Sequence, residues 1–344
     1  KTLIQIKDAM YRFEVNQSRT IVVVAPRLLL ANQLCSDFLE HVDNANVLHV
    51  HSGDTKHFKT TKADRINLFV SMCHTVREHV IIFTTYHSLH RIVESGIDID
   101  TIYFDEAHNS VQRHFFESTD VLSKKADRAF FFTATRKTSA VTNKPGMNWV
   151  DTYGQVIARV SAPELVDGGY ILPPQVKVID MDKHPVKACT PLIDAQNVLT
   201  SIDDMGLKKI LVCVKTTKQL TTLFQTDFAY QLTERGYSYL YITAKTGAVI
   251  DGKKVNRDVF FNTLNKWGKD PDKKFIVLHR SILSEGINVS ELEGVVFMRN
   301  MDAIEMTQTI GRVIRIGQKS KTYGMLCVPV YSNVGVSTQR SLQR

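Results

Sequence analysis

The sequence predicts an α/β protein built from two doubly wound parallel sheets. Apolar runs rich in β-branched and aromatic residues recur along its 344 residues, with helix-like segments between them. These runs are continuous and do not alternate with polar residues, which indicates that helices cover both faces of each sheet. A chain of this length suits about two domains.

The expected strands fall into two groups of five. In the first half they are Ile21–Ala25, Val47–Val50, Val80–Thr85, Ile102–Phe104 and Ala129–Thr133. In the second half they are Ile210–Val214, Tyr239–Thr243, Phe275–His279, Val295–Met298 and Gly324–Val330. Segments such as Leu28–His41 and Gln219–Arg235 are periodic and long enough to be crossover helices, and Leu3–Phe13 is also helix-like.

A linker is expected between the two groups. Ser161-Ala162-Pro163-Glu164 has the pattern of a capping box with proline in the first turn, so a short helix should begin there. Gly168-Gly169 should end that helix, and Pro173-Pro174 should hold the next stretch extended. The predicted organisation is therefore a first domain over residues 1–158, a hinge over 159–178 and a second domain over 179–344.

Composition narrows the class of protein. Hydrophobic residues make up 43% and charged residues 23%, and no apolar run approaches the ~20 residues of a membrane span. The N-terminus lacks the layout of a secretory signal, and the five scattered cysteines indicate reduced thiols. We therefore expect a cytoplasmic protein without membrane contacts, or a nuclear one in a eukaryote. The net charge of +8, with no acidic residue from Met306 to Arg344, favours a polyanionic partner such as nucleic acid.

Asp105 and Glu106 directly follow the expected buried strand Thr101–Phe104. That position places both carboxylates at the edge of a sheet, where open α/β folds bind ligands. One acid there can hold Mg²⁺, and a second can polarise a water molecule that attacks a phosphate. Taken alone, the pair is equally compatible with a solvated strand end.

Lys1-Thr2 stands before the helix-like Leu3–Phe13, as the last residues of a phosphate-binding loop would. Lys1 lies 104 positions before Asp105, enough for the intervening strands and helices. The glycines of such a loop are absent, so the sequence looks as though it begins inside its own loop. A Gly-x-Gly encoded upstream of Lys1 would support this interpretation, whereas a genuine start at Lys1 would argue against ATPase activity.

Several further motifs occur in a fixed order, and together they resemble superfamily 2 helicases and translocases of the DEAH type. The restriction-type and repair-type members are the most similar, because Thr84-Thr85-Tyr86-His87-Ser88-Leu89 and the Gly-Tyr-Ile-Leu-Pro-Pro segment of the hinge resemble theirs. In chain order the motifs are Ala25-Pro26-Arg27 (motif Ia), Asp105-Glu106-Ala107-His108 (motif II), Thr133-Ala134-Thr135 (motif III), Ser284-Glu285-Gly286-Ile287-Asn288 (motif V) and Gln308 to Arg315 (motif VI).

The resemblance implies two tandem RecA-like domains with an ATP cleft between them. Asp105 would then be the Mg²⁺ acid and Glu106 the water-activating base. The other implied roles are phosphate and Mg²⁺ contacts for Lys1 and Thr2, nucleotide contacts for His108, Gly286 and Asn288, coupling for His108, Thr133 and Thr135, and catalysis for Gln308, Arg312 and Arg315. Arg312 and Arg315 are spaced to share one helical face, where they would act as arginine fingers, and the alternative is that both are solvated.

The expected nucleic-acid contacts are Pro26, Arg27, Thr84, Thr85 and Ser281, since tracking along a backbone uses main-chain amides, hydroxyls and basic side chains. For Thr84 and Thr85 an equal alternative is that they are ordinary strand-end residues. Ser281 stands where many members carry a phosphate-binding threonine, and it would substitute for that residue.

The predicted function is an ATP-dependent motor, most simply a DNA helicase, with ATP and Mg²⁺ as cofactors. DNA is favoured over RNA because the resemblance is to DNA-directed members. The alternatives are an RNA helicase, a duplex-DNA translocase that does not separate strands, and a catalytically dead nucleic-acid-binding scaffold. Accessory domains or subunits outside this chain are compatible with each of these.

Two other features invite a functional interpretation. His49, His51, His57 and His74 lie close in sequence, but no acidic or cysteine companions stand at metal-site spacing, which favours polar strand histidines. Ala248–Val255 carries Asp251-Gly252 between apolar flanks, a hairpin pattern. With Lys245, Lys253 and Lys254 this segment is either a basic finger or, by a small margin, a solvated loop.

Overall fold

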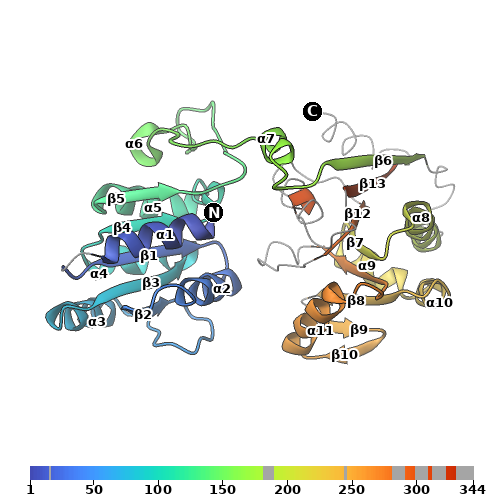
Figure 1. The fold of residues 1–344 in the computed structure, drawn as a ribbon, viewed down its shortest axis with the longest axis horizontal. Coiled ribbons are helices and arrows are strands. Elements are labelled where there is room, and N and C mark those ends of the chain that lie inside the picture. The colour runs from blue at the N-terminus through green and yellow to red at the C-terminus, as the bar shows by residue number, and fades with distance from the viewer. Residues whose placement is uncertain are drawn as a thin grey trace. The chain divides into compact units, whose positions relative to one another are not determined.

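The computed structural model describes residues 1–14, 17–180, 190–243, 246–280, 291–298, 309–311 and 323–330. The chain divides into two compact units, Lys1–Ala158 and Arg159–Arg344. Both units are α/β, as the sequence predicted (Figure 1). None of the helices in the described ranges has the length and apolar composition of a membrane-spanning segment.

The first unit contains a five-stranded parallel sheet with the strand order β2-β3-β1-β4-β5. In that order the strands are Ala45–Val50, His79–Thr85, Thr20–Ala25, Thr101–Phe104 and Arg128–Phe131. Every residue of β1, β3 and β4 is buried, which accounts for the continuous apolar runs within them. Because all five strands are parallel, the residues that follow β1, β3, β4 and β5 lie at the same edge of the sheet.

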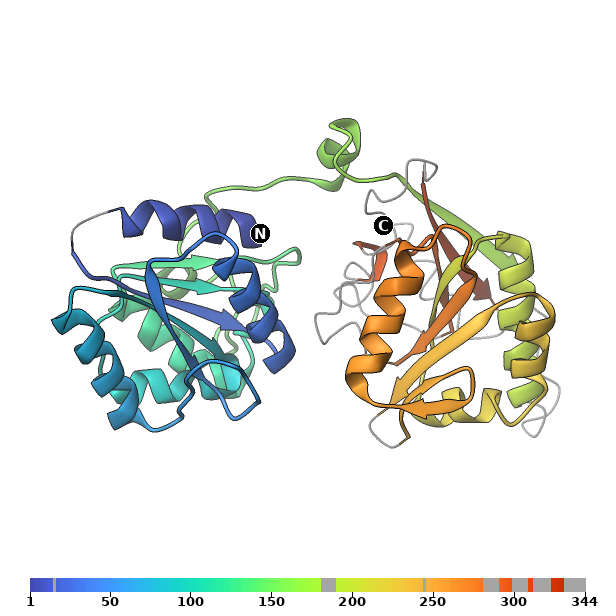
Figure 2. The ribbon, with the colours of Figure 1, turned by 60° about the horizontal axis from the view of Figure 1, so that its bottom comes forward.

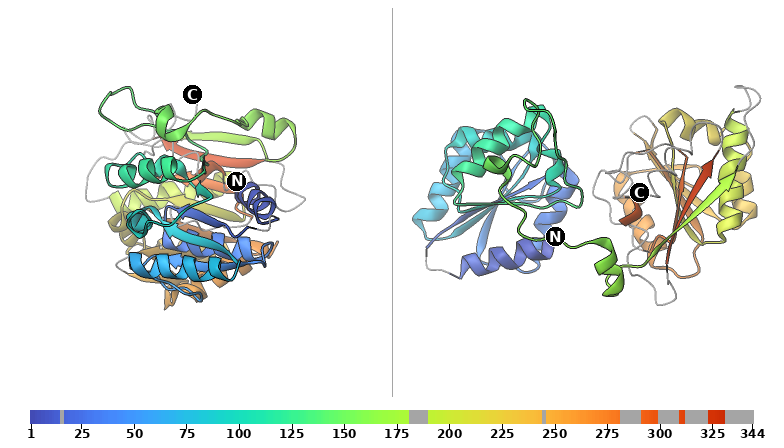
Figure 3. Two further views of the ribbon diagram at one scale, coloured as in Figure 1. Left: turned by 90° about the vertical axis from the view of Figure 1, so that its left-hand side faces the viewer. Right: turned by 90° about the horizontal axis from the view of Figure 1, so that it is seen from above.

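Two layers of helices cover this sheet (Figure 3). On one face, α1 and α2 pack against strand residues such as Ile21 and Val23, and on the other face α3, α4 and α5 pack against Val22 and Val24. The alternation of Ile21 to Val24 between the two clusters follows from the period-two geometry of a strand. The helices are α1 (Thr2–Phe13), α2 (Leu28–Leu39), α3 (Ala63–Thr75), α4 (Leu89–Ser95) and α5 (Arg113–Lys125), with short 3₁₀ turns η1 (Tyr86–Ser88) and η2 (Ala107–Asn109) and a one-turn helix α6 (Val150–Tyr153).

The segment expected as a linker begins with α7 (Ala162–Asp167). Its capping box is formed as predicted, since the Ser161 hydroxyl accepts from the Glu164 amide and the Glu164 carboxylate accepts from the Ser161 amide. The extended stretch after Pro173 becomes β6 (Pro174–Asp180), which pairs with β13 (Gly324–Val330). The last part of the expected linker is therefore the edge strand of the second sheet.

The second unit contains an eight-stranded sheet with the order β10-β9-β8-β11-β7-β12-β13-β6. Its remaining strands are β7 (Lys209–Cys213), β8 (Ser238–Thr243), β9 (Gly247–Ile250), β10 (Lys253–Val255), β11 (Phe275–His279) and β12 (Gly294–Phe297). The expectation of an entirely parallel sheet is wrong at one edge, because β9 runs antiparallel to both β8 and β10. The other six strands each run parallel to their neighbours, in the order β8, β11, β7, β12, β13 and β6.

The antiparallel edge is the hairpin that Asp251-Gly252 indicated. Both residues have positive φ angles, 45° and 78°, as a two-residue turn matching the strand twist requires. The Asp251 carboxylate accepts from the Tyr239 amide at 2.8 Å and so ties the turn to β8. The segment is a paired hairpin and not a solvated loop, and the Lys253 and Lys254 side chains on it are exposed.

Helices lie on both faces of the second sheet (Figure 2). The helices α8 (Thr190–Met205), α9 (Thr217–Leu223) and α10 (Phe228–Glu234) pack on one face against residues that include Ile210 and Ile276. On the other face α11 (Arg257–Lys269) contacts Phe275 through Trp267, with ring centroids 5.8 Å apart. The prediction of a single helix over Gln219–Arg235 is wrong, because the helix is interrupted between α9 and α10.

Candidate functional site

The turn after β4 positions Asp105 and Glu106. The Asp105 amide donates to the Val24 carbonyl at 2.9 Å, which continues the β1–β4 pairing one residue past β4. Glu106 then takes a left-handed conformation with φ 44°, which is uncommon for a residue with a side chain. The chain reverses at this residue and enters η2. Such strain persists only where surrounding contacts fix it, and it is frequent at functional sites.

Asp105 is a buried carboxylate with spare acceptor capacity. It is 5% exposed, and its Oδ1 atom has no hydrogen-bond partner within the described ranges. Burial raises the pKa of this carboxyl, and the charge of Glu106 adds to that effect while Lys1 opposes it. A buried acid whose ionised form is disfavoured by its surroundings is stabilised by a cation, so Asp105 suits a Mg²⁺ ligand.

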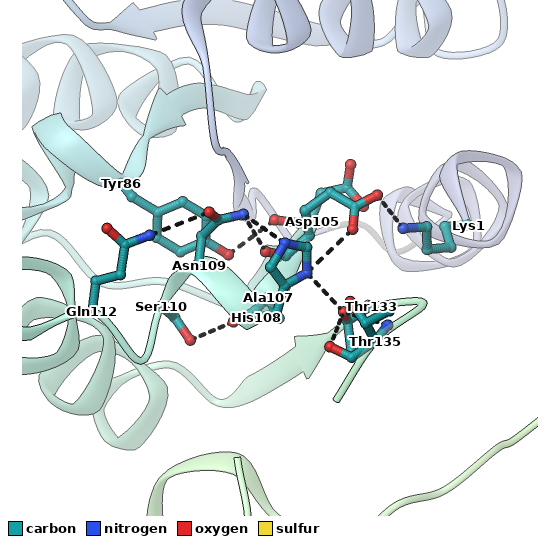
Figure 4. A network of polar contacts seen from close by, with 11 residues as sticks. Lys1, Tyr86, Asp105, Ala107, His108, Asn109, Ser110, Gln112, Thr133 and Thr135 are labelled. Carbon is teal, nitrogen blue, oxygen red and sulfur yellow. Dashed lines mark hydrogen bonds and ion pairs between the residues drawn. The ribbon is translucent and has the colours of Figure 1, made fainter. Parts of the chain in front are cut away.

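The Tyr86 side chain stabilises the same turn through a hydrogen bond to its backbone. Its hydroxyl donates to the Asp105 backbone carbonyl at 2.9 Å (Figure 4). The residue is 2% exposed, and its ring packs with those of Phe104 and Phe115. Tyr86 lies within a motif of the sequence, but no role was predicted for it. A tyrosine directly after a buried strand is a usable signal, because a buried phenol needs a hydrogen-bond partner.

Glu106 is paired with Lys1 at the start of α1. The Lys1 Nζ atom lies 2.5 Å from Glu106 Oε1, and the two side chains are 34% and 22% exposed. The other carboxylate oxygen, Oε2, lies 3.5 Å from His108 Nδ1. The structure thus brings together Lys1, Asp105 and Glu106, three of the residues that the sequence predicted for nucleotide chemistry. Thr2 is the first residue of α1 and is half-buried.

His108 joins this turn to the residues after β5. Its Nδ1 atom lies 3.0 Å from the Thr133 hydroxyl, which in turn donates to the Thr135 carbonyl at 3.0 Å and accepts from the Thr135 amide at 3.1 Å. His108 Nε2 lies 3.3 Å from the side-chain amide nitrogen of Asn109. The Nδ1 atom is thus the ring nitrogen that faces both Glu106 and Thr133 (Figure 4).

The backbone reinforces this link. The Phe132 amide donates to the Phe104 carbonyl, and the Ala107 amide donates to the Phe132 carbonyl, each at 2.9 Å. The segment that carries Thr133 and Thr135 is therefore held to η2 by main-chain bonds as well as by His108. All three residues expected to couple the site to other parts of the protein lie in one hydrogen-bonded unit.

The expected nucleic-acid contacts differ in accessibility. Arg27 is exposed at the N-cap position of α2, next to half-buried Pro26, and the first turn of α2 has no acidic residue. Thr84 is fully buried and donates its hydroxyl to the Val50 carbonyl at 2.9 Å, and Thr85 is 3% exposed. This burial favours the alternative in which Thr84 and Thr85 are strand-end residues that hold β3 against β2.

The second-unit residues of the predicted site lie outside the described ranges. They are Ser281, Gly286, Asn288, Gln308, Arg312 and Arg315.

The fold defines a class, the proteins with RecA-like α/β units. Residues 1–138 match a protein family described as "Type III restriction enzyme, res subunit". The resemblance to restriction-type and repair-type helicases is thereby confirmed. No curated protein matches the chain in sequence.

The solved structures that share the fold include the following three. The chain is similar to the ATP-dependent Type ISP restriction-modification enzyme LlaBIII bound to DNA, with a TM-score of 0.76 and 17% identity over 99% of this chain and 27% of that one. A nuclease-deletion mutant of the Type ISP enzyme LlaGI in complex with a DNA substrate mimic gives 0.69 and 18%, over 99% and 26%. The Pyrococcus furiosus Hef helicase domain gives 0.58 and 12%, over 100% and 93%. The chain thus spans about a quarter of the length of the two Type ISP enzymes.

Proposed function

We propose that this chain is the motor part of an ATP-dependent DNA motor. The observation that carries the proposal is the acidic turn after β4, where Asp105 and Glu106 meet Lys1 at the start of α1 and are joined through His108 to Thr133. An acid for Mg²⁺, a second acid for water, a lysine for phosphate and a link to a neighbouring loop are the parts that phosphoryl transfer by a motor requires.

The residues present suit a magnesium nucleotide. Asp105 has a buried oxygen free to bind Mg²⁺, and the Thr2 hydroxyl is the second candidate ligand. The first turn of α1 contains no acidic residue, so the partial positive charge of the helix N-terminus is available to phosphate. When bound, Mg²⁺ would neutralise the charge that develops on the phosphate oxygens.

Lys1 and Glu106 would change partners during the cycle. In the structure their charges are paired with each other. Phosphate oxygens would draw Lys1 away, and this exchange would free Glu106 Oε1 to accept a proton from the attacking water. His108, which faces Glu106 Oε2 and contacts Thr133, would transmit the change to the segment after β5.

DNA binding is proposed at the same edge of the first sheet. Arg27 and Pro26 precede α2, and basic side chains and helix N-termini are typical contacts for a phosphate backbone. The DNA-bound state of the two Type ISP relatives supports DNA as the partner. By the family resemblance, Gln308 would contribute to catalysis, and Arg312 and Arg315 would act as arginine fingers.

Two kinds of movement fit this machinery. Strand separation would make the chain a helicase, and movement on duplex DNA would make it a translocase. The similar solved structures include restriction-modification enzymes as well as a helicase domain, so both movements are candidates.

The test is ATP hydrolysis by the protein that the gene encodes, including any residues before Lys1, with and without DNA or RNA. Glu106→Gln should lower the stimulated rate by at least 100-fold, because a general base contributes roughly 10²–10⁴-fold, while leaving DNA affinity intact. Glu117→Gln, on the exposed side of α5, is the matched control. Equal rates in the Glu106 and Glu117 variants would refute the proposed role. Unwinding of tailed duplexes and displacement of a third strand from a triplex then distinguish helicase from translocase.

A further inference from the structure

A second cluster of chemically versatile side chains lies on the α1–α2 side of the first sheet. Cys35 on α2, His49 on β2 and His57 in the loop after β2 each offer one ligand atom, and these atoms all lie within 4.8 Å of one another. Cys35 and His49 are buried and His57 is exposed. The sequence prediction of simple polar strand histidines missed Cys35, because the helix brings that residue to the histidines from 14 positions away.

His49 presents an unused nitrogen to this cluster. Its Nδ1 atom is hydrogen-bonded to His51 Nε2 at 2.9 Å, which leaves Nε2 as the atom available to a ligand. His49 is fully buried, and its Nε2 atom has no hydrogen-bond partner in the part of the chain that the structure describes. A buried polar atom without a partner is rare in folded proteins and calls for an ion or a water molecule.

The arrangement around His49 resembles that of a metal ligand with its support. A histidine that binds a metal usually holds its other ring nitrogen in a hydrogen bond, which fixes the ring orientation, and His51 does this here. The rings of His49 and His57 stack at 10°, with centroids 5.6 Å apart.

We propose that Cys35 Sγ, His49 Nε2 and one ring nitrogen of His57 bind a zinc-class metal ion. One thiolate and two imidazoles suit Zn²⁺, with the fourth tetrahedral position left to water. Tetrahedral bonds of ~2.3 Å to sulfur and ~2.0 Å to nitrogen put neighbouring ligand atoms ~3.3–3.5 Å apart. The present separations, 4.8 Å at most, therefore need to shrink by up to about 1.5 Å. The exposed loop that carries His57 can supply this movement.

The ion would fasten a loop that already lies against α2 and β2. Within the loop over residues 51–60, the Phe58 carbonyl accepts from the His49 amide at 2.9 Å, and the Thr60 amide donates to the His49 carbonyl at 3.0 Å. Asn32 on α2 donates to the Asp54 carbonyl at 2.9 Å. The proposed role is therefore structural: the metal would stiffen α2, the helix that begins directly after Arg27.

Metal-free protein titrated with Co²⁺ tests the proposal. We expect one equivalent to produce a sulfur-to-cobalt charge-transfer band with tetrahedral d–d bands, and Zn²⁺ to remove both. Zn²⁺ should also raise the thermal midpoint of the first unit. Absence of a band, or a band that persists in Cys35→Ala, would overturn the proposal.

Matched variants distinguish the site from other thiols and histidines. His57→Asn, at an exposed position that should not disturb folding, should weaken Zn²⁺ binding at least tenfold and abolish the thermal shift. His51→Asn should weaken it roughly 10- to 100-fold, as loss of a supporting hydrogen bond does. Cys73→Ala, another buried cysteine, and His90→Asn, another exposed histidine, should bind as the unaltered protein does. Equal affinity in His57→Asn and His90→Asn would refute the assignment.

Discussion

Replacing Tyr86 with phenylalanine removes one hydroxyl from beneath the acidic turn and keeps the ring. The lost hydrogen bond to the Asp105 carbonyl is buried, and no other donor to that carbonyl occurs among the described residues. Leaving a buried acceptor without its donor costs about 1–2 kcal/mol. In a unit of this size, that loss should lower the thermal midpoint by roughly 2–8 °C.

The same change should slow ATP hydrolysis. Glu106 follows Asp105 in a left-handed conformation, so its carboxylate position depends on how firmly the Asp105 backbone is held. If the full cost of the lost hydrogen bond is added to the activation free energy of hydrolysis, the rate falls roughly tenfold, since about 1.4 kcal/mol corresponds to that factor. Calorimetry and a DNA-stimulated ATPase assay measure the two effects.

Tyr153→Phe is the matched control for this experiment. Its hydroxyl lies 2.9 Å from the Ser110 hydroxyl, in the same unit and at a similarly buried position, and does not touch Asp105. We expect it to reduce stability without a comparable loss of activity. Equal activity losses in the two variants, or unchanged stability in Tyr86→Phe, would contradict the reasoning.

Three further outcomes are expected. Thr133→Val, which removes the partner of His108 Nδ1, should preserve basal ATP hydrolysis but reduce its stimulation by DNA several-fold, and unchanged stimulation would argue against coupling through His108. Arg27→Ala should weaken DNA binding and reduce the salt slope by about 1, measured by anisotropy at several salt concentrations, whereas an unchanged slope would exclude a phosphate contact. His79 is buried, and this burial lowers its pKa below the ordinary value of about 6.5. The neutral His79 therefore contributes its full stabilisation above about pH 6.5. That stabilisation is lost as the pH falls from there through the lowered pKa of the folded protein. The urea midpoint of the unaltered protein should therefore fall more between pH 7.5 and 5 than that of His79→Gln, and parallel curves would refute this.

The parts of the fold that depend on local sequence were predictable. Runs such as Val80–Phe83 are apolar throughout because both faces of the strand are covered. The Ser161 capping box and the Asp251-Gly252 turn have short-range chemical causes. The break between α9 and α10 was not predicted. There the Thr226 hydroxyl donates to the Leu223 carbonyl at 2.6 Å and accepts from the Phe228 amide at 3.2 Å. Side-chain bonds of this kind compete with the helix, and apolar periodicity does not reveal them.

The site was predictable only where a motif keeps its residues together. Asp105, Glu106 and His108 are consecutive or nearly so, and the strand before them indicates where they lie. The Tyr86 hydrogen bond and the Cys35–His49–His57 cluster instead depend on how a helix or a turn is placed on the sheet. Sequence separation carries no information about that placement, so these contacts required the structure.

Parallel strand order explains why the motifs of the first unit converge. Pro26 and Arg27 follow β1, Tyr86 follows β3, Asp105 and Glu106 follow β4, and Thr133 comes two residues after β5. Because these strands are neighbours and run in one direction, segments up to about a hundred residues apart meet at a single edge. The buried oxygen of Asp105, the strained turn at Glu106 and the His108–Thr133 contact all lie at that edge. A change in the charge of Glu106 would therefore alter the contacts of His108 and, through Thr133 and the bonded backbone, the position of the segment after β5. A movement of Asp105 would displace Tyr86, which precedes α4.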